Sequence, residues 1–205
     1  MHRLCLIALL SLCASGARAD AWHFSLESGL LSWRRSTTEL PFRDSNTKQV
    51  AVGFPSGLGA RVGYLPLEVL EVGLYGSVHW TKFKIDGSSA NKLANFEALA
   101  YARYVLPGKA LRFFVGPTIG IAFQQSRAED QAALTSRALV VGGQLGLYGF
   151  VRDALSIDPF LSFLFTRGTL EVPNDLPGGF GGRTEYDDSG IQLVLGVAVS
   201  GWLVR

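Results

Sequence analysis

Apolar residues recur at every second position through most of the chain after residue 20. A period of two predicts strands with one apolar face and one polar or small face. The connections alternate between long polar stretches and short turns, so every long connection falls on the same side. Eight segments follow this pattern. It predicts an all-β fold, an eight-stranded antiparallel up-and-down transmembrane β-barrel.

The connections define the expected topology. The long ones are residues 35–49, 82–92, 125–136 and 168–187, and the tight turns are residues 65–68, 107–110 and 152–154. Strand parity places the tight turns and both mature termini in the periplasm, with the long loops outside. Three prolines lie inside or near strands: Pro55, Pro117 and Pro159. Because proline cannot donate to a strand ladder, we expect local bulges, or a second strand that begins after Pro55.

Residues 1–19 are typical of a secretory leader. A short basic start precedes the apolar run Leu4 to Leu12, and Ala17-Arg18-Ala19 is a small-x-small cleavage signal. The apolar run is too short to cross a bilayer as a helix. We therefore expect a signal peptide over residues 1–19 and one barrel domain over residues 20–205.

Removal of this leader changes the cysteine and charge balance. Both cysteines, Cys5 and Cys13, lie within it, so the mature chain is expected to lack disulfides, thiol nucleophiles and thiolate metal sites. The leader also takes Arg3 and Arg18 from the 19 lysines and arginines, which leaves equal numbers of basic and acidic residues. A neutral chain gives no argument for nucleic-acid binding. The sequence has no phosphate loop and no paired-histidine spacing, so no cofactor or metal is expected.

The bulky face of the strands is predicted to meet lipid. The strand cores carry no Asp, Glu, Lys or Arg on that face, where an Arg or Lys near the bilayer midplane would cost about 2–4 kcal/mol. A soluble barrel would show the reverse arrangement. Aromatic residues near the strand ends predict two interfacial girdles, Trp22, Phe24, Tyr64, Tyr104 and Phe113 at one rim and Trp80, Phe96, Phe123 and Phe165 at the other.

The second face is predicted to line a narrow lumen with a charged and polar network. Its members are Glu27, Arg61, Glu71, Tyr75, Glu97, Tyr101, Arg103, Arg112, Gln144 and Asp158. Arg103 and Arg112 flank one tight turn and require an anion, and Glu71 on the neighbouring strand is the nearest candidate. The simplest interpretation is a salt-bridged plug that fills the lumen. The alternative is an ion path or anion site.

A catalytic interpretation rests on polar residues that share strand faces. His23, Ser25 and Glu27 lie on one face, as do Tyr75 and His79. Successive residues on one strand face are about 6.5–7 Å apart, which is too far for direct proton transfer. A lipid-modifying hydrolase is therefore the third hypothesis, after a structural or interactive barrel and a small-solute channel.

The strand pattern over the whole mature chain resembles the small eight-stranded outer-membrane barrels of the OmpA/OmpX type, although it contains no diagnostic motif. Such barrels usually end on an aromatic residue that belongs to the assembly signal. Here the chain ends Trp202-Leu203-Val204-Arg205, with the aromatic residue displaced inward. The resemblance implies an outer-membrane location and contact with outer-membrane lipid and the barrel-assembly machinery. From the residues themselves we expect no enzymatic activity, and a structural or surface-interaction role presented through the long loops to an unknown ligand.

Overall fold

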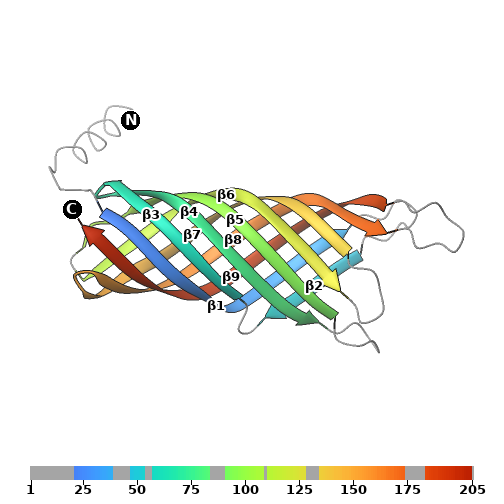
Figure 1. The fold of residues 1–205 in the computed structure, drawn as a ribbon, viewed down its shortest axis with the longest axis horizontal. Helices are drawn as coiled ribbons and strands as arrows, with labels where there is room; N and C mark the ends of the chain where they lie inside the picture. Colours follow the sequence, from blue (N-terminus) through green and yellow to red (C-terminus); the bar gives the residue numbers. More distant parts are fainter. Residues whose placement is uncertain are drawn as a thin grey trace, which may run out of the picture.

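The computed structural model describes residues 21–38, 47–53, 57–83, 91–108, 110–127, 134–173 and 183–204. The described residues form a closed tube of antiparallel strands (Figure 1). The expected leader lies outside them. In chain order the strands are β1 (Ala21–Thr38), β2 (Thr47–Gly53), β3 (Gly57–Leu67), β4 (Leu70–Phe83), β5 (Asn91–Val105), β6 (Leu111–Arg127), β7 (Leu134–Arg152), β8 (Leu155–Pro173) and β9 (Arg183–Val204).

The strand segments make an eight-stranded ring because β2 and β3 share one position in the wall. β3 pairs with the first half of β1, from Ala21 to Gly29, and β2 pairs with its second half, from Ser32 to Thr38. β9 pairs with β1 along its length and closes the ring. The predicted all-β, up-and-down barrel is confirmed. Closure pairs the backbone groups between strands, as the hydrocarbon region requires.

The two ends of the tube differ as the sequence predicted. Ala21 and Val204 are register partners and lie at the end of the tube that carries the short turns (Figure 1). The strands extend further toward the other end than expected. β8 continues to Pro173 and β9 begins at Arg183, although the expected loop spanned residues 168–187. The prediction ended each strand where apolar alternation ends, but backbone pairing continues through polar residues.

The prolines interrupt pairing on one side without a bulge, contrary to expectation. Around Pro117 the register with β7 is continuous, while the pairing with β5 skips residues 102 and 103 and resumes in the same register. Pro159 pairs normally with β9 and lies in a gap of the β7–β8 ladder. Each residue directs its N–H to one neighbour only, so a missing N–H weakens one ladder. Pro55 lies outside the described residues, and β3 begins after it at Gly57, which agrees with the other expectation.

Register shifts occur instead at three other places. They fall between Gly29 and Leu31 in β1, and at the two turns that follow Tyr64 and Phe150. The shift in β1 explains why Leu30 and Leu31, which are consecutive, are both exposed. One additional residue there restores the alternation, so that Ser32 again faces the interior.

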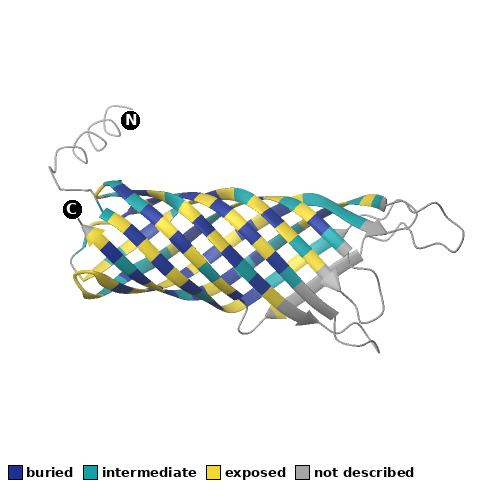
Figure 2. Ribbon diagram, viewed as in Figure 1, coloured by how far each residue is buried: buried dark blue, intermediate teal, exposed yellow. Residues whose placement is uncertain are grey.

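Where burial is described, buried and exposed positions alternate along the strands and around the wall (Figure 2). Leu26 is 74% exposed and Leu74 is 68% exposed, whereas Glu71 on the same strand as Leu74 is 0% exposed. Of the nine girdle aromatics, all are exposed except Tyr64, which is half-buried and packs against Trp22 with ring centroids 5.1 Å apart. A continuous exposed apolar belt of this size indicates contact with lipid.

The described residues contain no helix long and apolar enough to cross a membrane.

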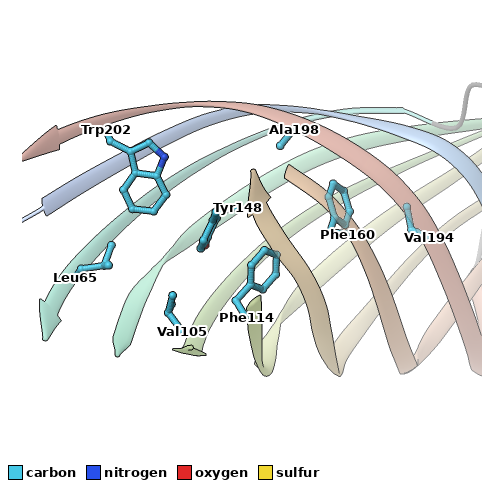
Figure 3. Packing of buried hydrophobic residues seen from close by; sticks show 8 residues of the cluster. All are labelled: Leu65, Val105, Phe114, Tyr148, Phe160, Val194, Ala198 and Trp202. Atoms are coloured by element: carbon cyan, nitrogen blue, oxygen red, sulfur yellow. The ribbon is translucent and has the colours of Figure 1, made fainter. Parts of the chain in front are cut away.

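Apolar and aromatic side chains also fill the interior, where the sequence predicted Tyr75 and Tyr101 but not the large aliphatic residues or Phe114, Phe160 and Trp202. The short-turn cluster contains Leu65, Val105, Phe114, Tyr148, Phe160, Val194, Ala198 and Trp202 (Figure 3). A second cluster further along the axis contains Tyr75, Leu99, Tyr101, Ala122, Val140 and Leu164. Both occupy positions on the polar face of the alternation. The signal was present as unbroken apolar runs, such as Phe113-Phe114-Val115, in which the central residue points inward.

The lipid-facing assignment can be tested at Leu145, which is 54% exposed on β7. Leu145→Arg is expected to lower the free energy of unfolding in lipid vesicles by about 2–4 kcal/mol, because it places a cation in hydrocarbon. Ala154→Arg, at an exposed position in the β7–β8 turn, is the control and should change stability little. Urea titration of both variants measures the difference. Equal losses would contradict the assignment.

Candidate functional site: the interior charge network

Glu71 on β4 is the centre of a hydrogen-bonded network inside the tube. Its Oε1 accepts a hydrogen bond from the hydroxyl of Tyr101 at 2.6 Å and lies 2.9 Å from His23 Nδ1. Its Oε2 accepts a hydrogen bond from the hydroxyl of Tyr148. A carboxylate only accepts, so His23 donates through Nδ1. Side chains from β1, β4, β5 and β7 therefore meet at one carboxylate.

Two arginines connect this carboxylate to a second one across the lumen. Arg103 Nη1 lies 3.9 Å from Glu71 Oε2 and donates to the Tyr148 hydroxyl at 2.8 Å. The side-chain oxygen of Gln144 accepts from both Arg103 and Arg61, the latter at 3.2 Å. Arg61 Nη2 lies 2.5 Å from Glu27 Oε1. The network thus runs from Glu71 to Glu27 through alternating acceptors and donors.

Aromatic rings cover the faces of both guanidinium groups. The Arg103 carbon Cζ lies 4.1 Å from the ring centroid of Phe114 and 4.5 Å from that of Tyr101. Arg61 lies 5.2 Å from the Tyr101 centroid and 5.3 Å from that of Tyr75. Cation–π contacts of this kind gain strength when the cation is desolvated. They stabilise the two arginines where water is excluded.

The network is electrically balanced and fully enclosed. Glu27, Arg61, Glu71 and Arg103 provide two negative and two positive charges, and their exposed fractions are 3%, 2%, 0% and 1%. An unpaired charge buried in this way would cost several kcal/mol. Gly63 and Gly73 leave the room that the network needs, because a Cβ at Gly63 would collide with the Glu71 carboxylate and the Tyr101 hydroxyl.

His23 extends the network toward the closure of the barrel. Its ring stacks on the indole of Trp202, with centroids 4.4 Å apart and planes 15° apart. Its Nε2 lies 4.0 Å from Asp158 Oδ2, and Asp158 accepts a hydrogen bond from Ser200. The indole Nε1 donates to Ser156 Oγ at 2.9 Å. The first strand and the last strand are therefore joined by side chains as well as by backbone.

A separate polar group surrounds Glu97 nearer the long-loop end of β5. Asn95 Nδ2 donates to its Oε1 at 2.7 Å, and Ser77 Oγ donates to its Oε2 at 3.2 Å. His79 Nε2 lies 3.5 Å from the same Oε2. This carboxylate is satisfied locally by residues of β4 and β5.

The structure places the expected lumen residues unequally. Nine of the ten are buried, and Arg112 is the exception with intermediate burial. Arg112 Nε donates to the backbone oxygen of Gly108 at 3.0 Å, and its guanidinium lies 5.2 Å from the Phe150 ring centroid. In the described residues it shares no anion with Arg103, contrary to the expectation. It lies at the end of β6 beside the turn, where a backbone carbonyl satisfies it.

Three functional partners were missing from the expected network: His23, Tyr148 and Trp202. His23 and Tyr148 fall on the same strand faces as Glu27 and Gln144, so alternation alone could have included them. Trp202 falls on the inward face of β9 together with Ser200. Nothing in the sequence indicated that His23, Tyr101 and Tyr148, from three separate strands, would meet Glu71.

The candidate hydrolytic residues are held in other interactions. His23 bonds to Glu71, and Ser25 Oγ donates to Glu27 Oε1 at 3.4 Å. All three residues of β1 are buried. Within the described residues no group of three or more His, Cys, Asp or Glu side chains is arranged to hold a metal ion.

The comparisons with known proteins establish the fold. AlkL, solved by solid-state NMR in lipid bilayers, matches with a TM-score of 0.59 and 13% identity over 94% of each chain. The outer membrane protein OprG from Pseudomonas aeruginosa matches with a TM-score of 0.56 and 12% identity, over 89% of this chain and 97% of that chain. No protein-family model matches the chain, and no curated protein matches its sequence.

The chain therefore has the fold of the small eight-stranded outer-membrane β-barrels. This fold and the exposed apolar belt together place it in an outer membrane.

The network can be tested at its centre. Glu71→Gln is expected to destabilise the folded barrel by about 3–5 kcal/mol, because it leaves the buried Arg103 without its carboxylate. Glu68→Gln, in the exposed β3–β4 turn, should be close to neutral. Urea unfolding in the same lipid vesicles gives both values. Similar stabilities of the two variants would show that the network carries little free energy.

Proposed function

We propose that this outer-membrane barrel is plugged along its axis and acts through its long-loop end. The observation that carries the proposal is the enclosed chain of contacts from Glu71 through Arg103 and Gln144 to Arg61 and Glu27. It connects strands on opposite sides of the ring at a level where all five side chains are buried. An eight-stranded barrel has an interior only wide enough for side chains.

A second layer supports the same conclusion at the short-turn end. There the rings of Phe114, Tyr148 and Trp202 lie within van der Waals reach, with Tyr148 4.7 Å from Phe114 and 4.9 Å from Trp202 between centroids. Tyr148 belongs to both layers, since its hydroxyl bonds to Glu71. An ion would have to displace the charge network and then cross an apolar layer.

The long-loop end is the part of the molecule left for interaction. The expected loops 35–49, 82–92, 125–136 and 168–187 lie partly outside the described residues. A structural or surface-interaction role through these loops is the function that we propose. A narrow channel for small solutes is the alternative. The lipid-modifying hydrolase receives no support from the contacts of His23 and Ser25 described above.

Conductance separates the plug from the channel. The wild-type protein is expected to show no steady current in a planar lipid bilayer. Tyr148→Phe removes a hydroxyl but keeps the ring, so it should also remain closed. Phe114→Ala combined with Tyr148→Ala opens the aromatic layer and removes the Tyr148 hydroxyl that joins it to the charge network. This double variant should raise the conductance. Steady large conductance from the wild type would overturn the plug and favour the channel.

The orientation can be tested by labelling. The mature chain is expected to have no cysteine, so single cysteines can be added at Glu185, exposed on β9, and at Ala154, exposed in the β7–β8 turn. A membrane-impermeant maleimide applied to intact cells should label Glu185→Cys and leave Ala154→Cys unlabelled. Both should react after lysis. The reverse labelling of intact cells would invert the topology.

A further inference from the structure

The outer surface of the barrel carries a groove across β6, β7 and β8 at the long-loop end of the apolar belt. Its volume is about 430 Å³, and it is lined by Ile121, Ala122, Phe123, Arg137, Ala138, Leu139, Arg167, Gly168 and Thr169. Ile121, Phe123 and Leu139 point outward and are 47%, 43% and 54% exposed. The groove is therefore apolar toward the membrane and carries two arginines.

The two arginines lie where the hydrocarbon region is expected to end. A transmembrane strand of a barrel needs about 9–11 residues. In β7 the outward-facing residues of 139–149 are apolar or glycine, and in β8 those of 155–165 are apolar. Arg137 and Arg167 are the next outward-facing positions on their strands, and both are exposed.

Strand register brings the two guanidinium groups to one place. Arg137 is the partner of Thr169, and Leu139 is the partner of Arg167. Arg137 and Arg167 are thus diagonal neighbours on the same face, at a separation of about 7–8 Å between the parent backbones. Within the described part of the chain neither guanidinium is in an ion pair. Two carboxylates lie on the same face nearby: Glu171 is two residues from Thr169, the partner of Arg137, and Asp187 is two residues from Ser189, the partner of Arg167.

We propose that this groove binds a phosphorylated glycolipid of the outer leaflet, with its phosphate held by Arg137 and Arg167 and its acyl chains against Ile121, Phe123 and Leu139. Guanidinium groups match phosphate oxygens with paired hydrogen bonds. A basic pocket beside an apolar membrane surface is the arrangement that recognises an anionic lipid headgroup. The boundary position of the two arginines suits a ligand that is anionic at one end and apolar at the other.

This proposal rests on the orientation under Proposed function, because the groove faces the outer leaflet only if the long-loop end is outside. The labelling experiment tests that orientation separately. The groove itself is independent of whether the lumen conducts.

The test uses the full mature barrel in phosphatidylcholine nanodiscs, with diphosphoryl lipid A as the probe and native mass spectrometry to measure bound lipid. Arg137→Gln combined with Arg167→Gln is expected to weaken lipid A binding about tenfold or more. The corresponding double change to lysine keeps the charge but not the paired geometry, and it should give an intermediate loss. Lipid A without its phosphates should bind wild type and variant equally weakly.

Arg35→Gln is the matched control, because Arg35 is an exposed arginine at the same end of β1, outside the groove. It should change lipid A affinity by less than about twofold. An equal loss from Arg35→Gln, or equal binding of phosphatidylglycerol, would replace the proposed site with general attraction to anionic lipid and overturn it. Competition by millimolar inorganic phosphate would identify a free-phosphate site and overturn the lipid proposal. All three outer-surface variants should keep the wild-type circular dichroism spectrum.

Discussion

The closure of β1 against β9 is the constraint on which the rest of the structure depends. In hydrocarbon no water is available for an unpaired N–H or C=O group, so a sheet can span the membrane only as a ring. The pairing of Ala21 with Val204 and of Thr38 with Asp188 extends this closure along almost the whole of both strands. Once the ring closes with eight strands, the enclosed space is small, and the inward-facing side chains must fill it with their charges satisfied.

The interior meets this requirement with two different kinds of contact. The charge network pairs Arg61 with Glu27 and Arg103 with Glu71, and Asp158 beside it accepts a hydrogen bond from Ser200. The short-turn cluster is made of hydrophobic residues, so it has no charges to pair, and it excludes water from one side of the network. Tyr148 belongs to both, so its ring and its hydroxyl serve different purposes. Exclusion of water strengthens the ion pairs, and the balanced charges allow that exclusion.

Alternation in the sequence was sufficient for the faces of the strands. It placed Leu74 and Leu145 toward lipid and Glu71 and Gln144 inside. A strand has only two faces, and the face that carries charged residues cannot lie in hydrocarbon. It could not place the ends of β8 and β9, since polar side chains neither require nor prevent continued pairing. It also expected bulges at prolines, although the missing N–H affects only one of two ladders.

The network was harder to predict than the faces. Alternation grouped most of its members, but which acid meets which arginine depends on the tilt and stagger of the strands around the ring. Arg112 shows the limit, because it has the correct parity and lies beyond the enclosed level. The interior positions of Leu99, Phe114 and Val140 were hidden in runs where both faces are apolar.

The stacking of His23 on Trp202 has a consequence for the order of events during biogenesis. One ring belongs to β1 and the other to β9, so the stack cannot form until β9 has been made and has met β1. Before that moment the His23 ring lacks the indole face of Trp202, although the indole N–H can already donate to Ser156 on the neighbouring strand β8. A barrel in which β9 has not yet met β1 therefore lacks the stability of the closed ring, and the docking of Trp202 on His23 accompanies the step that makes the protein difficult to unfold.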